Sequence, residues 1–334
     1  MNESPARIIP EPLLVELRRA SHVVLLTHSH PDGDALGSLF ACAAILEGLG
    51  KTVFCFLEEP VSHHYDFLPE KDRASCDLEE YHRFVAAAGS DLVMVGLDCG
   101  DGDRLGKLKD KFLCIEPFVV IDHHRSHRPF GTVSWVDPCR SSTGEMIYEL
   151  AVALQAPISF PCAYNLYVAI CTDSGSFRYE CTTSRTMQIA AALLDMGVRP
   201  EEVGSHLYDK YSIERLKLME MVLSTIALFA DDQIAFMHVT DEMLRQSGAS
   251  IQDVEGFVDL PRSLYSVKVA VLIKETGNGA IAVSMRAKGQ CDVARVAKEF
   301  DGGGHRNAAG FRLHGKTVDE VRLAVKEALC RVLS

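Results

Sequence analysis

Residues 23–34, which read Val-Val-Leu-Leu-Thr-His-Ser-His-Pro-Asp-Gly-Asp, decide the fold. The first four of these residues are apolar without alternation and Thr27 follows them, which is typical of a strand covered on both faces of a sheet. The next segment, Ala35–Leu49, carries apolar residues at helical spacing and ends before Gly50, a frequent helix terminator. A buried strand, a polar loop and a helix in this order predict the first unit of an α/β domain.

The same pattern continues along the first part of the chain. Further short apolar runs predict strands at Val53–Leu57, Leu92–Leu97 and Phe118–Ile121. Helical spacing predicts helices at Ser142–Leu154, Ala163–Cys171, Thr183–Met196 and Pro200–Tyr208. The fold class is therefore α/β, a parallel doubly wound sheet in which ligands bind beyond the C-terminal ends of the strands.

The pattern changes after a predicted long helix at Ser212–Phe229. Strands are predicted at Gln233–Val239, Ser266–Lys274 and Ala280–Arg286, with a hairpin turn at Gly277-Asn278-Gly279, and helices at Val293–Phe300 and Val318–Leu333. The chain thus divides into an α/β domain at residues 1–198, a helical connector at 199–228 and a smaller α+β domain at 229–334.

Composition limits the class of protein. With 334 residues, 47% hydrophobic and 24% charged, the chain is expected to form two globular domains. No apolar run reaches the roughly 18 residues of a membrane span, and the N-terminus lacks a signal-peptide pattern, so we expect a cytoplasmic protein without membrane contacts. The net charge of −12 disfavours long duplex nucleic acid as a partner. The 11 cysteines contain no C-x-x-C pair, which predicts free thiols.

Acidic and histidine side chains follow the predicted strands and one predicted helix. The segments concerned are His28–Asp34, Asp98–Asp101, Asp122–His124 and Thr172–Gly175. If the sheet is parallel, the first three segments meet at one edge, and the fourth can join them. Clustered buried carboxylates repel one another, and divalent cations remove that conflict.

The charges and ligand types predict a site for two metal ions. Four carboxylates, those of Asp32, Asp34, Asp98 and Asp173, balance two divalent cations, and His28 and His123 add neutral nitrogen ligands. This mixed set suits Mn²⁺, and also Fe²⁺, Co²⁺ or Zn²⁺, better than Ca²⁺. Two such ions can together activate water and hold a phosphoryl oxygen.

Each segment also has a purely structural interpretation. Asp34 alone would serve as the N-cap of the following helix, Asp98–Asp101 alone would be an ordinary turn, and Ser141–Gly144 is foremost a helix N-cap. The combination of four segments favours the metal site. A dinucleotide-dependent dehydrogenase is excluded because no G-x-G-x-x-G follows the first strand.

Together these motifs resemble the DHH phosphoesterase superfamily, and Gly302–Gly310 resembles the glycine-rich signature of its associated DHHA1 domain. The motifs span residues 28–310, and the two-domain layout is most similar to the nanoRNase/pAp-phosphatase group. The resemblance implies that one metal is held by His28, Asp32 and Asp98, and the second by Asp34, Asp98, His123 and Asp173. It further implies that His124 faces the substrate phosphate and that Asp122 orients the histidine pair. His127 departs from the asparagine frequent in relatives.

The second domain is expected to bind substrate, with the active site in the cleft between the domains. Glycines bring backbone N–H groups close to an anion, and cations flank the glycine run. The predicted substrate-binding residues are Ser284, Arg286, Gly302, Gly303, Gly304, His305 and Arg306. A solvated Arg286 at a strand end is the structural alternative.

The resemblance implies a Mn²⁺-dependent phosphodiesterase and exonuclease that releases nucleoside 5′-monophosphates from short RNAs or linear dinucleotides. Removal of the 3′-phosphate of 3′-phosphoadenosine 5′-phosphate (pAp) is a second implied activity, and a homodimer is compatible with the family. The alternatives are an inorganic pyrophosphatase, which the glycine-rich signature disfavours, a cyclic dinucleotide phosphodiesterase and a non-catalytic nucleotide sensor. A complete ligand set disfavours the sensor.

Overall fold

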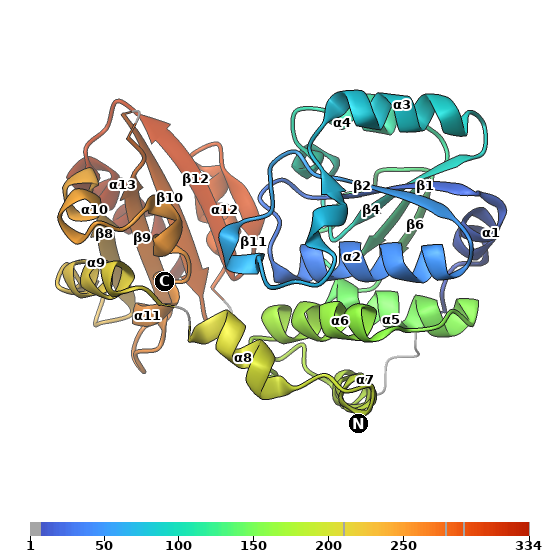
Figure 1. Cartoon of the computed structure of the whole chain (residues 1–334). Coiled ribbons are helices and arrows are strands. Elements are labelled where there is room, and N and C mark those ends of the chain that lie inside the picture. The colour runs from blue at the N-terminus through green and yellow to red at the C-terminus, as the bar shows by residue number, and fades with distance from the viewer. Residues whose placement is uncertain (1–7, 210, 278, 290, 334) are drawn as a thin grey trace. The chain divides into compact units, whose positions relative to one another are not determined.

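The computed structural model describes residues 8–209, 211–277, 279–289 and 291–333. The chain forms two compact units, Met1–Asp209 and Lys210–Ser334, each with its own sheet (Figure 1). Each unit has its own buried hydrophobic clusters.

The first unit is built on six parallel strands in the order β3-β2-β1-β4-β5-β6. Their bounds are β1 His22–Thr27, β2 Thr52–Phe56, β3 Ala74–Ser75, β4 Leu92–Leu97, β5 Phe118–Asp122 and β6 Val133–Val136. The four strands predicted for this part are confirmed, while β3 and β6 were not predicted. Strand order reverses between β1 and β4, and such a reversal is where parallel sheets bind ligands.

Helices cover both faces of this sheet (Figure 1). The helices of this unit are α1 Glu11–Arg19, α2 Gly33–Gly48, α3 Leu78–Ala88, α4 Lys109–Leu113, α5 Thr143–Leu154, α6 Phe160–Asp173, α7 Ser184–Asp195 and α8 Pro200–Tyr208. Val23 and Leu25 of β1 pack into the cluster that includes α2, α5 and α6, whereas Val24 and Leu26 pack into the cluster with α3 and α4. The doubly wound fold is therefore confirmed, and its buried strands explain the absence of alternation in sequence.

The second unit contains a mixed sheet in the order β11-β12-β10-β9-β8-β7. Its strands are β7 Ala227–Phe229, β8 Ile234–Val239, β9 Val269–Glu275, β10 Ala280–Ala287, β11 Gly303–His305 and β12 Ala308–His314. Its helices are α9 Ile213–Leu223, α10 Asp241–Ser247, α11 Asp259–Arg262, α12 Val293–Lys298 and α13 Val318–Leu333. Helices α12 and α13 pack on one face of the sheet, and α9 packs on the other face over β8 and β9. The smaller α+β domain is confirmed.

The predicted helix Ser212–Phe229 is wrong in its last part. Helix α9 ends at Leu223, and β7 pairs antiparallel with β8. The hydroxyl of Thr225 donates to the carbonyl of Val222 and accepts the backbone N–H of His238, so it turns the chain onto the free edge of β8. The apolar residues at the end of the helical pattern, Ala227–Phe229, therefore form an edge strand instead of a helix.

Three smaller findings complete the fold. The 11 cysteines are free thiols, as predicted. None of the helices formed by the described residues combines the length and apolar character that a bilayer span requires. Gly277 and Gly279 both have positive φ at the predicted hairpin turn between β9 and β10, whereas Asn278 lies outside the described residues.

Candidate metal centre

Strand register brings the first site residues together. The last residues of β1 and β4 lie opposite one another, and the end of β4 lies opposite the penultimate residue of β5. The next residues along the chain are His28, Asp98 and Asp122, so they follow side by side at the C-terminal edge of the sheet. This edge lies at the reversal of strand order, as expected for a ligand site.

Close helix packing brings in the carboxylates of the helices. A Cβ added to Gly37 of α2 would lie 2.4 Å from the carbonyl oxygen of Asn165 in α6. A Cβ added to Gly144 of α5 would lie 2.5 Å from the Cβ of Ala169, also in α6. Glycine at both positions therefore lets α2, α5 and α6 approach closely enough for the start of α2 and the end of α6 to face one centre.

Asp34 is fixed by the start of α5. Its buried carboxylate, 1% exposed, accepts hydrogen bonds from the backbone N–H groups of Thr143 and Gly144 at 2.7 and 2.9 Å, and from the hydroxyl of Ser38 at 3.1 Å. The N-cap of α2 is instead Asp32, which accepts the N–H of Asp34. The capping interpretation of Asp34 is therefore wrong.

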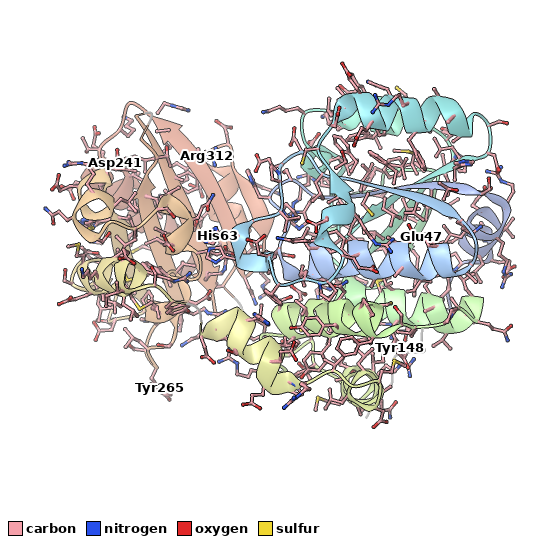
Figure 2. The ribbon with its side chains drawn as sticks, in the orientation of Figure 1. Glu47, His63, Tyr148, Asp241, Tyr265 and Arg312 are labelled. Carbon is pink, nitrogen blue, oxygen red and sulfur yellow. The ribbon has the colours of Figure 1, made fainter. Side chains whose placement is uncertain are left out.

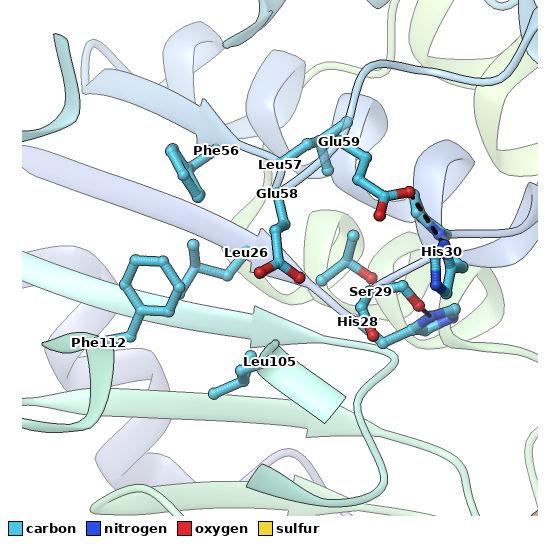
Figure 3. A pocket seen from close by; sticks show the side chains of 12 residues that line it. Leu26, His28, Ser29, His30, Phe56, Leu57, Glu58, Glu59, Leu105 and Phe112 are labelled. Atoms are coloured by element: carbon cyan, nitrogen blue, oxygen red, sulfur yellow. Dashed lines mark hydrogen bonds and ion pairs between the residues drawn. The ribbon is translucent and has the colours of Figure 1, made fainter. Parts of the chain in front are cut away.

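The first group of potential ligands consists of His28, Asp32 and Asp98. Nε2 of His28 lies 3.5 Å from Oδ2 of Asp98 and 4.0 Å from Oδ1 of Asp32. Nδ1 of His28 lies 2.9 Å from the carbonyl oxygen of Ser29, to which it donates a proton (Figure 3). In this tautomer Nδ1 carries the hydrogen, and the lone pair of Nε2 points toward the carboxylates. A histidine that binds a metal through Nε2 requires this tautomer.

The second group consists of Asp34, His123 and Asp173. Nε2 of His123 lies 3.6 Å from Asp34, 3.2 Å from Asp173 and 3.5 Å from Asp98. Nδ1 of His123 lies 3.3 Å from the carbonyl oxygen of Arg140, to which it donates, so its Nε2 is also free to act as a ligand atom. The six side chains predicted to bind metal thus converge.

Asp98 links the two groups: it belongs to the first, and it forms a further group of potential ligands with His123 and His124. One of its oxygens faces His28 and the other faces His123. It is 2% exposed, accepts a hydrogen bond from the hydroxyl of Thr143 at 3.0 Å, and has φ +55°. Aspartate and asparagine adopt this left-handed conformation more readily than other residues with a side chain. Asp98 is therefore not an ordinary surface turn residue.

The electrostatics of this cluster fit divalent cations. Burial, and then the charges of Asp98 and Asp173, raise the pKa of Asp34 well above its usual range. Partial burial and the charge of Asp98 raise the pKa of Asp173 to about 6, against the opposing effect of His123. Carboxylates that repel one another in this way are stabilised when cations bind between them. The donor set therefore suits metal ions.

Asp122 links two histidines behind this cluster. Its fully buried carboxylate accepts hydrogen bonds from Nδ1 of His124 at 2.5 Å and Nδ1 of His127 at 2.6 Å. Burial opposes the charged form of His124, but the bond to Asp122 and the charge of Asp98 raise its pKa to about 9. His124 is therefore an oriented imidazolium at neutral pH, suited to contact a phosphate.

The chain also matches known proteins. The model of the DHH family, N-terminal domain, matches residues 22–170, and that of the DHHA1 domain matches residues 231–330. The bifunctional oligoribonuclease and PAP phosphatase NrnA of Thermus thermophilus is 30% identical over 308 residues, covering 92% of this chain and 89% of that protein. The chain belongs to the DHH/DHHA1 phosphoesterase family. The resemblance to its nanoRNase/pAp-phosphatase group is thereby confirmed.

Two further comparisons agree with this assignment to the DHH/DHHA1 family. The enzyme of the same name from Bacillus subtilis is 25% identical over 312 residues, which are 92% of this chain and 95% of that protein. The structure of an exopolyphosphatase-related protein from Bacteroides fragilis superimposes with a TM-score of 0.90 and 26% identity, covering 98% of each chain. Membership confirms the predicted enzyme class, a hydrolase of phosphoester bonds.

The DHHA1 domain places its predicted substrate residues on adjacent strands. Ser284 and Arg286 lie on β10, opposite Gly310 and Ala308 of β12. The glycine run continues into β11, which pairs with β12, and Arg306 follows in the connecting turn. The side chain of His305 lies outside the described part of the chain.

The three glycines of this run differ in what they do for the fold. A Cβ added to Gly302 would lie 2.4 Å from the carbonyl oxygen of Gly310, and one added to Gly304, whose φ is +136°, would lie 2.5 Å from that of Ala308. Gly303 is exposed, and a Cβ there would meet nothing within 4 Å. Close packing in the β11–β12 hairpin requires glycine at positions 302 and 304. The open space at Gly303 leaves its backbone accessible to a ligand.

These differences predict opposite effects of two matched substitutions. We expect Gly303→Ala to leave the melting temperature unchanged and to raise KM for a short RNA, because only a bound ligand would meet the new methyl group. Gly302→Ala is expected to lower the melting temperature, since backbone atoms of β12 must move. Thermal unfolding and steady-state kinetics of both variants measure this, and an unchanged KM for Gly303→Ala would contradict it.

The clustered acids of the DHH domain predict how pH affects metal stabilisation. Because the pKa of Asp173 is about 6 in the fold, above its ordinary 3.8, its contribution to the stability of the metal-free chain is lost as pH rises from about 4 through 6. His124, with a pKa of about 9 above its ordinary 6.5, loses its own contribution as pH rises from about 6.5 through 9. Bound cations offset the repulsion between deprotonated ligands.

The rise in melting temperature on adding Mn²⁺ should therefore be larger at pH 7.5 than at pH 5. Thermal unfolding with and without the ion measures it. Asp173→Asn serves as the control and should flatten the pH dependence of the metal-free chain between pH 4 and 6. Equal rises at both pH values would contradict this account of the site.

Sequence reasoning missed two residues of the site. Thr143 contacts Asp98 through its hydroxyl and Asp34 through its N–H, whereas the sequence predicts foremost a helix N-cap for this segment, which Ser142 does provide. His127 was noted as a departure from the family but given no role. No local pattern would have indicated Thr143, because the carboxylates it contacts lie 109 and 45 positions away in the chain.

Proposed function

We propose that this chain is a metal-dependent phosphodiesterase and exonuclease that hydrolyses very short RNAs and linear dinucleotides to nucleoside 5′-monophosphates. Removal of the 3′-phosphate of pAp is proposed as a second reaction of the same centre. The convergence of His28, Asp32, Asp34, Asp98, His123 and Asp173 carries the proposal. The names of the relatives from Thermus thermophilus and Bacillus subtilis support the substrate class.

The residues present would hold two divalent cations, with Mn²⁺ the preferred ion. His28, Asp32 and Asp98 would bind one, and Asp34, Asp98, His123 and Asp173 the other. Such ions supply Lewis acidity, which lowers the pKa of water and neutralises charge on phosphoryl oxygens. Ser29 and Arg140 fix the two histidines through their carbonyl oxygens, so that both Nε2 atoms face the centre.

His124 and Asp122 act on the substrate side of this centre. We assign His124 the task of binding a non-bridging phosphate oxygen, because its imidazolium carries the positive charge that a pentacoordinate phosphorus requires nearby. Asp122 keeps the proton on Nδ1 of His124 and thereby fixes the ring's orientation. His127 shares Asp122 and stacks on Phe130, with ring centroids 5.7 Å apart, which limits movement of the carboxylate.

The DHHA1 domain is proposed to bind the remainder of the substrate through Ser284, Arg286, Arg306 and the Gly302–His305 segment. A phosphate at Arg286 would gain a charge-assisted hydrogen bond. The location of the active site between the two domains stays a prediction. If both domains bind one substrate, the preferred length is limited to a few nucleotides.

A substrate-length series tests the proposal. Purified protein with Mn²⁺ is given pAp, linear and cyclic dinucleotides, a pentanucleotide and a 24-nucleotide RNA, and products are resolved by chromatography. We expect rapid release of nucleoside 5′-monophosphates from the linear dinucleotide and slow attack on the 24-mer. Faster hydrolysis of the cyclic than of the linear dinucleotide would support the alternative cyclic dinucleotide phosphodiesterase, and hydrolysis of neither would contradict the proposal.

A further inference from the structure

Three cations share one face of the sheet in the DHHA1 domain. Lys274 of β9 and Arg312 of β12 both lie directly opposite Ala282 of β10. Directly opposite residues of antiparallel strands place their side chains on the same face, so one methyl group separates the two cations. Arg286 lies four residues further along β10, on that face too, since side chains alternate with a period of two.

Among the described residues, little negative charge compensates these cations. Among the residues that the structure describes, neither Lys274 nor Arg312 makes a hydrogen bond or an ion pair. Arg286 donates only to the backbone carbonyl of Met285, at 3.2 Å. Glu255 is the one carboxylate whose charge acts appreciably on Lys274, and the two do not form an ion pair. With one carboxylate acting on it and no ion pair, the ammonium group would be stabilised further by a bound anion.

The environment of Lys274 supports the same conclusion. Burial lowers the pKa of Lys274, and the charges of Arg312 and Arg286 lower it further. A cation held near other cations without a partner disfavours its own charged form. A bound anion would offset the effect of burial and the repulsion from Arg312 and Arg286. The cluster therefore favours anion binding over a purely structural role.

The face is partly open where the cations lie, with Lys274 and Arg286 partly buried. Ala282 and Ser284 are partly exposed, and Arg312, labelled in Figure 2, is exposed on β12. The opposite face of β10 packs on α12 and α13 through Val283 and Met285. The hydrophobic cluster beneath α9 includes Ala270 and Leu272 of β9, but it includes no described residue of β10 or β12. The small side chain of Ala282 therefore leaves access between the two cations.

We propose that Lys274 and Arg312 form a second anion subsite, which binds a terminal phosphomonoester of the substrate while Ser284 and Arg286 bind the neighbouring phosphate. This inference rests on the proposed function. Two cations match the charge of a phosphomonoester, about −1.5 to −2 at pH 7, better than the single charge of a diester. Ala282 and Ser284 lie two residues apart, about 6.8 Å along an antiparallel strand, a spacing comparable with that of successive phosphates.

The subsite makes binding depend on the phosphate at the end of the substrate. Full-length protein without divalent cations, which leaves the ligand uncleaved, is titrated calorimetrically with a diribonucleotide that carries or lacks a 5′-phosphate. We expect the phosphorylated ligand to bind the wild-type protein about tenfold or more tightly, as for hydrogen bonds between charged groups. Lys274→Met and Arg312→Met should each reduce this ratio toward one, with affinity for the unphosphorylated ligand unchanged.

A matched control and a salt titration separate binding from structural effects. Lys298→Met removes an exposed lysine from α12, on the layer behind the opposite face, and should leave the ratio unchanged. Each subsite variant should lower the slope of log affinity against log salt for the phosphorylated ligand by about 0.7, as expected for one cation fewer on a single strand. A perturbed fold without a phosphate contact would not produce that change.

Two results would overturn the subsite. One is a wild-type protein that binds both dinucleotides equally; the other is a ratio that is the same in the wild type and in both variants. Failure of the proposed function is a separate result, since the wild-type protein with Mn²⁺ would then hydrolyse neither dinucleotide. Hydrolysis of both together with an unchanged ratio would reject the subsite alone.

Discussion

Asp98→Asn is expected to abolish turnover while the chain stays folded. Asp98 belongs to one group of potential ligands with His28 and Asp32 and to another with His123 and His124, so its loss is expected to weaken both proposed cation positions at once. We expect kcat to fall by about three orders of magnitude or more, because loss of one electrostatic stabiliser already costs about 10²–10³. Asparagine is preferred to alanine here, since it tolerates the φ of +55°. Steady-state kinetics on a linear dinucleotide with Mn²⁺ measure the effect.

The fold should survive this substitution because two effects oppose each other. Burial raises the pKa of Asp98, but the neighbouring imidazoles of His28, His124 and His123 lower it to about 2, so the carboxylate contributes stability at neutral pH. Its removal, however, also relieves repulsion on Asp34.

Asp101→Asn, three residues along the same loop, is the matched control for Asp98→Asn. Asp101 caps a short 3₁₀ helix, Gly102–Leu105, and pairs with Arg128 outside the ligand groups. We expect near wild-type kcat for this variant. Retained activity in Asp98→Asn would disprove the proposed site.

Asp122→Asn is expected to lower kcat by about 10²–10⁴, with a smaller effect on KM. The two carboxylate oxygens accept from Nδ1 of His124 and Nδ1 of His127. An amide can offer only one acceptor, so at least one imidazole loses its partner or adopts the other tautomer. An equivalent exchange in a histidine–carboxylate pair of a serine protease lowers kcat by about 10⁴. Steady-state kinetics and thermal unfolding of the variant measure the two effects separately.

Two variants of His127 test whether the loss of kcat in Asp122→Asn arises from a misoriented His124. His127→Asn retains an N–H donor for Asp122 and should keep kcat within a few-fold of wild type. His127→Leu removes the donor and should lower kcat by about 10–100-fold, as is typical when an outer hydrogen-bond partner of a site is lost. If Asp122→Asn keeps wild-type kcat, Asp122 does not orient His124 for catalysis.

The sequence predicts the metal centre of the DHH domain well because the potential ligands directly follow the buried strands that define the fold. Neighbouring parallel strands all end at the same edge of the sheet. The residues that follow β1, β4 and β5 therefore lie close together. The convergence of His28 and Asp98 follows from that topology. Asp173 was harder to place from topology alone, because its position depends on how closely α6 approaches α2 at Gly37.

Other features were missed because they depend on tertiary pairing. The strand β7 continues a helical pattern in sequence, and only the free edge of β8 explains it. The role of Thr143 depends on helix α5 beginning beside two carboxylates that are distant in sequence. Lys274 and Arg312 lie 38 positions apart in the chain and become neighbours only through the register of β10. No local pattern indicates such a pair.

The most direct test of the central claim is a crystal structure of the protein grown with Mn²⁺, with anomalous scattering recorded to locate the ions. The account predicts two manganese peaks at this centre, one contacted by His28 and Asp32 and the other by Asp34, His123 and Asp173, with Asp98 contacting both. An absence of manganese from these residues at saturating concentration, or density that shows the six side chains apart, would contradict it.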